Sequence, residues 1–573
     1  MPAVLLPFEI DKKKLRERRD SCNVIDLLSK QAKQAFENNP HVIDYLQIVP
    51  IEDYGMPKYY EQLDRSISSE KQPNLIYPVK DSVFVHILSD QLDGRNTYIP
   101  LEPSILVNLN ELMAEIERRL LDMSDMLVGF STKTDEEKRR AFLLCIDQIA
   151  GRARGPLPNS PKKSMFEKKL KPLPMSLRQL KAVKYQIIRD KIGLGALDTL
   201  VSDRYVEDIS CSGMGEIFLE HKIFSSLKTA IHFSTHEELD NFVMRLAERV
   251  KKPVSVNSPI VDATLPDGSR INIVYGRDVS KRGSNFTIRK FSETPLSVTE
   301  LIDMGTLDYK IAAYLSIMIG EGMNMFVCGE TASGKTTSMN ALTTFIHPNA
   351  KIVSIEDTPE LQVPHKNWIR EVVSTNKEGE ISGVTMIDLL KAALRQRPNE
   401  IIIGEIRGAE GAIAFQAMQT GHSVMATFHA ASVERLIQRL TGNPINVPKA
   451  YMDNLNIGLF QSAVKLPNGK VGRRMVSINE IVGYDPISQS FSFVEAFRWD
   501  SVTDSFIFSG DGNSYLLEYK IAPKLGIPIH KKRRIYAEIE RRAKILEKLS
   551  SQGVKNFYEL LDVIAKAQRE GLF

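Results

Sequence analysis

The sequence has few cysteines and none of the spacings that cysteine chemistry requires. Among its 573 residues are four cysteines, Cys22, Cys145, Cys211 and Cys328, which lie far apart and form no Cys-x-x-Cys pair. This pattern excludes the usual zinc-ribbon and dithiol-redox sites and also a disulfide scaffold. It fits a protein of the reducing cytosol.

Long hydrophobic runs are also missing. The longest apolar stretch, residues 311–320, is about half as long as a membrane-spanning helix needs to be. The first residues, MPAVLLPFEIDKKK, have no basic segment ahead of a long apolar core, so they do not resemble a signal peptide. We therefore expect a soluble protein, or one that only touches a membrane surface.

The chain lacks a large excess of either charge, since 75 Lys and Arg residues are balanced by 71 Asp and Glu residues. A net charge of +4 does not indicate a nucleic-acid-binding protein. The excess is local, however, because residues 152–191 contain 12 Lys or Arg residues and two acids. This proline-containing segment predicts a stiff basic linker running into a helix. It is either a solvated linker or a surface that faces anionic lipid headgroups or an acidic partner.

The length predicts about three to five domains at roughly 100 to 200 residues each. We expect an N-terminal extension, partly helical, over 1–151 and the basic linker over 152–191. A small α/β domain follows over 192–295, where short strands and helices alternate. A doubly wound α/β domain is expected over 296–485, and a C-terminal subdomain with charged helices over 486–573. The charged tail itself is typical of a solvated helical face.

One segment matches the pattern of a phosphate-binding loop, G-x-x-x-x-G-K-[ST]. An apolar strand pattern at 325–328 precedes it and a helical pattern follows it, which is the strand-loop-helix context that the motif requires. Glycines allow backbone N–H groups to approach and cradle a phosphate. The loop comprises Gly329, Glu330, Thr331, Ala332, Ser333, Gly334, Lys335 and Thr336, followed by Thr337. We expect ATP here, with Lys335 bridging the β- and γ-phosphates and Thr336 holding Mg²⁺.

Two further apolar segments end in carboxylates. The segment 351–357 ends in Glu356 and Asp357, and the segment 401–405 ends in Glu405. Sheet strands deliver catalytic groups at their C-terminal ends, so both segments are candidates once a phosphate loop lies in the same domain. Glu405 is a candidate to hold Mg²⁺ through water or to orient the attacking water. Which of Glu356 and Glu405 is the base stays open.

Histidines flank a third strand pattern, at residues 423–428. His422 and His429 each have two possible roles. Such a histidine either donates a hydrogen bond to a γ-phosphate, or to a residue that senses the phosphate, or it is purely structural. Because no Cys, Asp or third His nearby completes a ligand set, we do not expect these histidines to bind a metal.

Three arginines are candidate arginine fingers. Arg270, Arg277 and Arg289 lie in or at the end of the smaller domain, outside the phosphate-loop domain. From there they could reach a bound nucleotide across a domain or subunit interface and stabilise the charge on its γ-phosphate.

Four ordered motifs together resemble the type II/type IV secretion ATPase superfamily. They are most similar to the archaeal members that drive archaellum or type IV pilus assembly. The motifs are GETASGKTTSMNAL, SIEDTPEL at 354–361, LRQRPNEIIIGEIRGAE at 394–410 and TGHSVMATFHA at 420–430. Three earlier stretches look like the family's N-terminal nucleotide-covering domain, namely VEDISCSG at 206–213, LPDGSRINIVYG at 265–276 and FTIRKF at 286–291.

The resemblance implies a ring-shaped, usually hexameric ATPase that binds ATP and Mg²⁺ between two domains. A PAS-like domain and a RecA-like P-loop NTPase domain would clamp the nucleotide, giving an α/β fold. The resemblance assigns Glu356 to the Asp box, Glu405 to Walker B and His429 to the His box. The three arginines become candidate fingers supplied by a neighbouring subunit. The chain lacks the four-cysteine zinc module that bacterial type II members carry.

The function implied is a motor that powers assembly of an archaellum or type IV pilus-like filament, and whether it also rotates the filament stays open. Its expected partners are identical subunits, a polytopic membrane platform protein and filament-machinery subunits, and its expected place is the cytoplasmic face of the cell membrane. The alternatives are a general secretion or DNA-translocating ATPase of the same superfamily, or a nucleotide-gated scaffold without turnover. Intact Lys335, Glu356 and Glu405 argue against the scaffold.

Overall fold

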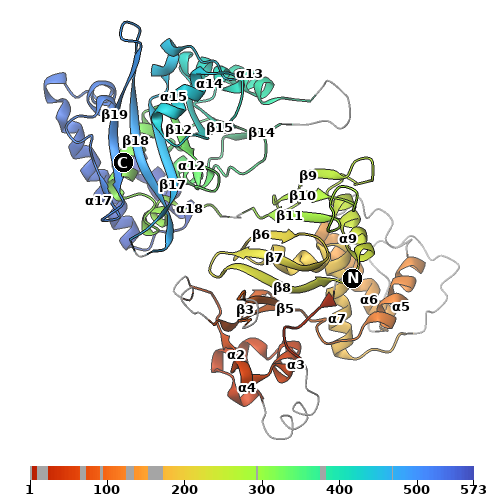
Figure 1. The fold of residues 1–573 in the computed structure, drawn as a ribbon. Coiled ribbons are helices and arrows are strands. Elements are labelled where there is room, and N and C mark those ends of the chain that lie inside the picture. The colour runs from red at the N-terminus through yellow and green to blue at the C-terminus, as the bar shows by residue number, and fades with distance from the viewer. Residues whose placement is uncertain are drawn as a thin grey trace. The chain divides into compact units, whose positions relative to one another are not determined.

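The computed structural model divides the chain into two compact units, Met1–Phe291 and Ser292–Phe573 (Figure 1). It describes residues 3–9, 24–64, 67, 72–90, 94–123, 134–151, 172–291, 294–373, 383–467 and 469–573. Within these ranges, none of the helices combines the length and the apolar character that crossing a membrane would take.

The first unit is built on one 11-stranded sheet in its described residues. The strand order is β2-β3-β4-β5-β8-β7-β6-β11-β10-β9, and β1 pairs with β8. The strands are β1 (Ala3–Val4), β2 (Lys58–Tyr59), β3 (Asn74–Lys80), β4 (Val83–Leu88), β5 (Thr97–Leu101), β6 (Val206–Cys211), β7 (Gly215–His221), β8 (Ser225–Phe233), β9 (Ile260–Thr264), β10 (Arg270–Val274) and β11 (Asn285–Arg289).

Helices surround this sheet and precede several of its strands. They are η1 (Val24–Leu27), α2 (Lys30–Phe36), α3 (Pro40–Ile48), α4 (Ile51–Tyr54), α5 (Asn110–Asp122), α6 (Asp135–Ile149), α7 (Leu177–Lys191), η5 (Gly195–Leu197), α8 (Asp198–Ser202) and α9 (His236–Arg249). The helix expected at the end of the basic linker is α7, which a capping box of Ser176 and Gln179 starts. Residues 152–171, the rest of that linker, lie outside the described residues.

The sheet runs across the boundary that we expected between the N-terminal extension and the small α/β domain. Strand β5 pairs in parallel with β8, with Thr97 opposite Lys228. Leu75 and Val85 of the N-terminal strands belong to the same buried cluster as Ile209 and Ile271. The extension and the small domain are therefore one structural unit, because these apolar strand faces bury each other.

The second unit is a doubly wound α/β domain with the phosphate-loop strand inside the sheet. Its 9-stranded sheet has the order β14-β13-β15-β16-β12-β17-β18-β19-β20 in the described residues. Pairing is parallel from β14 to β17 and antiparallel from β17 to β20. The strands are β12 (Met325–Gly329), β13 (Ile352–Glu356), β14 (Trp368–Val372), β15 (Glu400–Ile406), β16 (Ser423–Phe428), β17 (Ile457–Lys465), β18 (Val471–Asp485), β19 (Ser490–Asp500) and β20 (Ser505–Ile507).

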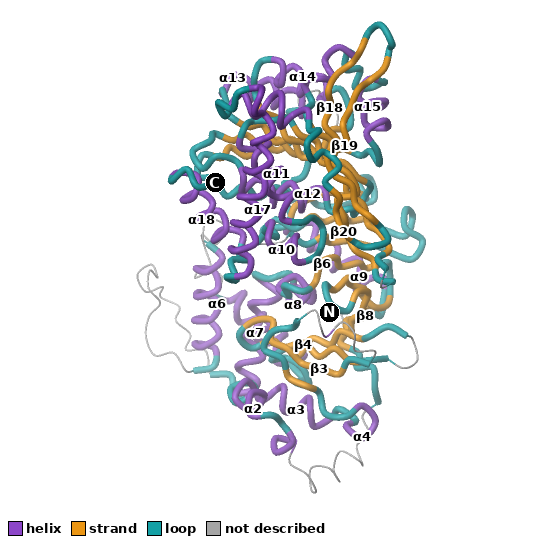
Figure 2. The backbone as a smooth tube through the Cα atoms, turned by 90° about the vertical axis from the view of Figure 1, so that its left-hand side faces the viewer, coloured by secondary structure: helices purple, strands orange, loops and turns teal. Residues whose placement is uncertain are grey.

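Helices cover both faces of this second sheet (Figure 2). They are α10 (Val298–Asp303), α11 (Tyr309–Gly320), α12 (Lys335–Leu342), η6 (Thr343–Phe345), α13 (Met386–Gln396), α14 (Glu410–Gln419), α15 (Val433–Thr441), η7 (Lys449–Asn454), a π-helix η8 (Leu516–Ile521), α16 (Ala522–Lys524), η9 (Ile529–Arg534), α17 (Ile535–Ser551) and α18 (Phe557–Arg569). Side chains of β12 alternate between the two cores, with Met325 and Val327 in one and Phe326 and Cys328 in the other. This is the expected doubly wound α/β fold.

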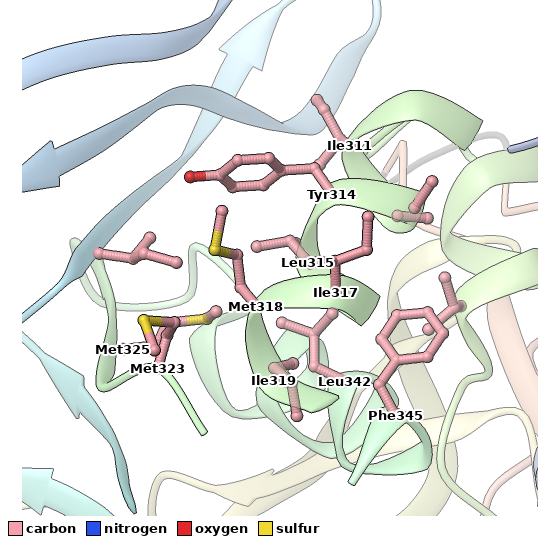
Figure 3. Packing of buried hydrophobic residues seen from close by; sticks show 14 of the residues in the cluster. Ile311, Tyr314, Leu315, Ile317, Met318, Ile319, Met323, Met325, Leu342 and Phe345 are labelled. Carbon is pink, nitrogen blue, oxygen red and sulfur yellow. The ribbon is translucent and has the colours of Figure 1, made fainter. Parts of the chain in front are cut away.

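The hydrophobic core beside the phosphate loop is shown in Figure 3. Tyr314, Ile317 and Met318 of α11 pack there with Met325 of β12 and Phe345 beyond α12. All five side chains are almost completely buried. The phosphate loop is thus held between a buried strand and a buried helix.

The C-terminal helices share this core, so the expected subdomain over 486–573 has no core of its own. Ile539 and Leu546 of α17 and Leu560 of α18 belong to the same buried cluster as Met325. The boundary expected at 485/486 falls in the hairpin of β18 and β19. The charges of the tail lie on the outer face, while apolar residues at helical spacing face the core.

Candidate nucleotide site

The phosphate loop joins β12 to α12, and its glycines are required by close contacts. A Cβ on Gly329 would collide with the carbonyl oxygen of Gln461. Gly334 has φ +95°, and a Cβ there would lie 2.9 Å from Nε2 of Gln461 and 3.1 Å from Cδ of Arg473. Ala332 also adopts a left-handed conformation, with φ 62°. The loop therefore has the turned backbone that presents successive N–H groups to an anion at a helix N-terminus.

Lys335 folds back over its own loop. Its Nζ donates hydrogen bonds to the carbonyl oxygens of Gly329 at 3.1 Å and Glu330 at 2.9 Å. The buried Oγ of Ser333 has no hydrogen-bond partner among the described residues. A phosphate group fits this cradle, because it would accept hydrogen bonds from both side chains and from the loop backbone.

Glu356 ends β13 and is almost completely buried, at 1% exposure. Its Oε1 accepts hydrogen bonds from the backbone N–H groups of Glu360 and Leu361, both at 2.7 Å. Its Oε2 lies 3.2 Å from Nε of Arg370. Burial raises the pKa of Glu356 in spite of these donors. Oε1 therefore holds the turn that follows the strand, and Oε2 is engaged by Arg370 of β14.

Glu405 lies near the end of β15, where the pairing with β16 shifts register between Ile403 and Ile406. Its Oε2 lies 2.5 Å from Nη2 of Arg407, and its Oε1 lies 2.7 Å from Nε2 of His429. The His429 contact has an ion-pair distance but not hydrogen-bond geometry, so Oε1 is buried without a hydrogen-bond donor. Oε1 of Glu405 thus lies beside His429 with its hydrogen-bond acceptor capacity unused.

The charges at this edge keep Glu405 ionised. Partial burial opposes ionisation, but the hydrogen bond and charge of Arg407 and the charge of Lys335 outweigh it and lower the pKa of Glu405. Burial, together with the charge of Lys335, lowers the pKa of His429 below its usual 6.5. At neutral pH the site therefore combines a carboxylate with a neutral imidazole.

The side chains of Thr336 and Glu405 fit a Mg²⁺ ion that is held mainly by the nucleotide. Thr336 lies half-buried in the first turn of α12, and Glu405, whose Oε1 accepts no hydrogen bond, lies near the end of β15 at the same sheet edge. In the described part of the chain, no three His, Cys, Asp or Glu side chains converge as metal ligands. Mg²⁺ is often held this way, by one or two protein oxygens together with phosphates and water.

Sequence reasoning missed two residues that contact the loop from β17 and β18. Gln461 of β17 accepts a hydrogen bond at 2.6 Å from Oγ of Ser338 in α12, and Arg473 of β18 donates from Nε to the carbonyl oxygen of Ala332 at 3.1 Å. Gln461 is a polar residue inside an apolar strand pattern, and this polarity could have marked it as a candidate site residue. Arg473 stands in a basic run and has no such signal, because only the fold brings it to residue 332.

The two histidines lie at opposite ends of β16. His429 follows the strand and contacts Glu405, whereas His422 precedes the strand and lies 3.1 Å from Oγ1 of Thr420. Only His429 therefore lies beside the phosphate loop.

The three candidate arginine fingers belong to the first unit, and all three are exposed. Arg270 of β10 and Arg289 of β11 are directly opposite each other in the sheet, and Arg277 lies in the loop after β10. Two like charges in this position destabilise a strand pair unless an anion or acid offsets them. The structure thus brings Arg270 and Arg289 together, and their contact with a nucleotide stays a prediction.

Known proteins with similar sequences identify the family. Residues 190–450 match the family described as type II/IV secretion system protein. The type IV secretion system protein PtlH of Bordetella pertussis is 33% identical over 230 residues, which are 36% of this chain and 68% of PtlH. The chain belongs to the type II/type IV secretion ATPase superfamily.

Two further relatives span more of the chain. The uncharacterized protein MJ0900 of Methanocaldococcus jannaschii is 42% identical over 561 residues, covering 96% of this chain and 98% of that protein. The crystal structure of the VirB11 ATPase of Brucella suis in complex with sulphate is 23% identical and covers 50% of this chain and 91% of VirB11, with a TM-score of 0.26.

Proposed function

We propose that this chain is a Mg²⁺-dependent ATPase motor that powers assembly of an archaellum or type IV pilus-like filament at the cytoplasmic membrane. One observation carries the ATPase part of the proposal. The phosphate loop after β12 lies at the same sheet edge as Glu405 and His429, at the ends of β15 and β16. Such an edge supports phosphoryl transfer, because it combines a phosphate cradle with an ionised acid.

Phosphate binding is assigned to the loop backbone, Ser333 and Lys335. Lys335 holds two carbonyl oxygens of its own loop, so its ammonium can exchange these neutral acceptors for phosphate oxygens without moving far. Thr336 and Glu405 are the residues that would hold Mg²⁺. When bound, Mg²⁺ neutralises developing charge on the phosphate oxygens.

Glu405 is the better placed of the two glutamates to orient water and accept its proton. Its pKa is lowered and one of its oxygens lacks a hydrogen-bond donor, whereas both oxygens of Glu356 are already bound. We assign Glu356 to positioning the turn at 357–361. Neutral His429 would report on the state of Glu405, because its Nε2 lies beside that carboxylate.

Assembly into a homohexameric ring, with Arg270, Arg277 or Arg289 acting on a neighbour's nucleotide, follows from the superfamily. A head-to-tail ring supplies such residues naturally across its interfaces. A polytopic platform protein as partner and a location at the cytoplasmic membrane belong to the proposal through the resemblance of the motifs to the archaeal pilus branch. A general secretion or DNA-translocating ATPase is the alternative that the motifs also allow.

ATP turnover by the purified chain tests the proposal. Lys335→Ala should lower Mg²⁺-dependent ATP hydrolysis by about a hundredfold or more, because it removes a cation from the transferring phosphoryl group. Lys366→Ala is a matched control, since Lys366 is an exposed lysine of the same unit. Equal turnover in the wild type and Lys335→Ala would refute the assignment of the phosphate loop, and absence of turnover in the wild type would favour a scaffold.

A further inference from the structure

A second strongly basic surface lies at the C-terminal end of the second unit. Residues 519–537, YKIAPKLGIPIHKKRRIYA, contain six Lys or Arg residues and no Asp or Glu. All of them belong to the described part of the chain.

The fold fixes the backbone of this segment and turns its basic side chains outward. Leu516, Ile521 and Ile535 are completely buried and anchor η8 and the start of α17 in the core. Buried Glu480 accepts a hydrogen bond at 3.0 Å from the backbone N–H of Leu516, and another from the hydroxyl of Tyr314 at 2.8 Å. The exposed side chains between these anchors therefore project from a rigid support.

Three of the six cations have partners within the unit. Lys532 forms a 2.6 Å ion pair with Glu518, Lys524 donates to the carbonyl oxygen of Glu321 at 2.8 Å, and Lys520 lies over the ring of Tyr515. The side chains of Lys531, Arg533 and Arg534 are on the surface, and no described residue forms an ion pair or hydrogen bond with them. These three charges are available to an anionic partner.

Large apolar side chains lie among the cations. Ile529 is 67% exposed, Tyr519 52% and Leu525 44%. Nζ of Lys532 lies 3.8 Å from the centre of the Tyr519 ring, so basic and apolar side chains are in contact on this surface. Exposed apolar side chains grouped with unpaired cations mark an interaction surface.

The basic linker over residues 152–191, which the sequence offered as a membrane-facing surface, differs because most of its described cations are paired. Its described half contains five Lys or Arg residues, and four of them form ion pairs within the first unit. These pairs are Arg178 with Asp44, Lys184 with Asp147, Arg189 with Glu102 and Lys191 with Glu117. Most of the described charge of that segment is thus neutralised inside the fold.

We infer that the surface of residues 519–537 docks on an anionic lipid bilayer. Lys531, Arg533 and Arg534 would meet the headgroups, and Ile529 and Leu525 would enter the interfacial layer, which is how peripheral proteins combine charge with apolar burial. Nucleic acid fits less well, because sequence-tolerant binding of single strands needs aromatic rings for stacking and Lys532 occupies one face of the Tyr519 ring. The inference rests on the proposed membrane location, but not on ATP turnover.

Vesicle co-sedimentation of the full-length chain without nucleotide tests the inference. The probe is phosphatidylcholine vesicles with added phosphatidylglycerol, compared with pure phosphatidylcholine. The triple variant Lys531→Glu, Arg533→Glu, Arg534→Glu should bind the anionic vesicles at least about tenfold more weakly, since each cation near such a surface contributes strongly. The double variant Leu525→Ser, Ile529→Ser should also weaken binding.

A matched triple variant separates this surface from net charge. Lys544→Glu, Lys548→Glu, Lys566→Glu changes the net charge equally at exposed lysines of α17 and α18, and its vesicle binding should stay within about threefold of wild type. Equal losses in both triple variants, no vesicle binding by the wild type, or tighter binding to DNA than to vesicles would each overturn the inference. Unchanged melting temperatures and unchanged ATP turnover exclude misfolding. If the wild-type protein binds the vesicles but does not hydrolyse ATP, the result counts against the proposed function and not against this inference.

Discussion

Glu356 and Glu405 illustrate at the scale of single residues how surroundings separate two identical side chains. Both end buried parallel strands, and their sequence contexts are alike. The fold surrounds Glu356 with two backbone donors and Arg370, whereas it leaves Oε1 of Glu405 without a donor. We therefore expect Glu405 to act on water and Glu356 to position the turn.

Arg473 of β18 tests whether its hydrogen bond to the phosphate loop supports nucleotide binding. Arg473→Ala removes the donor that holds the carbonyl oxygen of Ala332, so the KM for ATP and the Kd of a fluorescent ATP analogue should rise by about tenfold, the value of one charge-assisted hydrogen bond. Arg498→Ala, which changes an exposed arginine of β19, serves as the control. Unchanged nucleotide affinity in Arg473→Ala would mean that this contact does not support binding.

Strand β15 has a glutamate at each end, and the two differ in protonation. Glu400 begins the strand and is buried, with one oxygen lacking a hydrogen-bond partner among the described residues. Burial raises the pKa of Glu400 to about 8. At the other end, cations lower the pKa of Glu405. One element therefore carries a neutral acid and an ionised acid at neutral pH.

The raised pKa of Glu400 predicts a pH-dependent stability. Between about pH 4.5 and pH 8 the unfolded chain ionises at this residue while the folded chain keeps the proton, so stability falls as pH rises through this window. Glu400→Gln removes this contribution, so its stability relative to wild type should be about 4 kcal/mol greater at pH 8 than at pH 4. Melting temperatures of both proteins across this range measure the effect. Parallel pH profiles in the two proteins would contradict the assignment.

The sequence predicted the elements of the site well, because their signals are local. A strand, a glycine-rich loop and a helix follow one another in β12, residues 330–334 and α12, and the acids and His429 end neighbouring strands. These patterns depend on residues within one element or its immediate flanks.

Distant pairings were not accessible from local patterns. Residues 97 and 228 lie opposite each other, and Arg473 contacts residue 332, yet no short-range signal joins either pair. For the same reason the boundaries expected at 191/192 and 485/486 each separate strands that belong to one continuous sheet. The different surroundings of Glu356 and Glu405 also depend on such contacts, which is why the choice between them stayed open in the sequence.

At the scale of the whole molecule, the candidate fingers and the phosphate loop belong to different compact units. Arg289 lies in the first unit and Lys335 in the second. In a head-to-tail ring, a finger on one subunit would complete the site of its neighbour. This arrangement predicts complementation between defective subunits.

Mixing two inactive variants tests that arrangement. Arg289→Ala and Lys335→Ala should each have little ATP turnover, and an equimolar mixture should regain measurable turnover because some interfaces then combine an intact arginine with an intact loop. Co-purification of differently tagged subunits controls for mixed assembly. No recovery in confirmed mixed assemblies would place the arginine in the same subunit as its nucleotide, or outside the site.

The central claim is that an ionised Glu405, beside an intact phosphate loop, drives ATP hydrolysis. The most direct measurement is the Mg²⁺-dependent ATP turnover of Glu405→Gln, taken together with its affinity for ATP. The structure predicts a fall in kcat of about a hundredfold or more with ATP affinity within about threefold of wild type, because the amide keeps the shape of the site but cannot accept the proton. Turnover close to that of the wild type would contradict the claim and assign the chemistry to another residue.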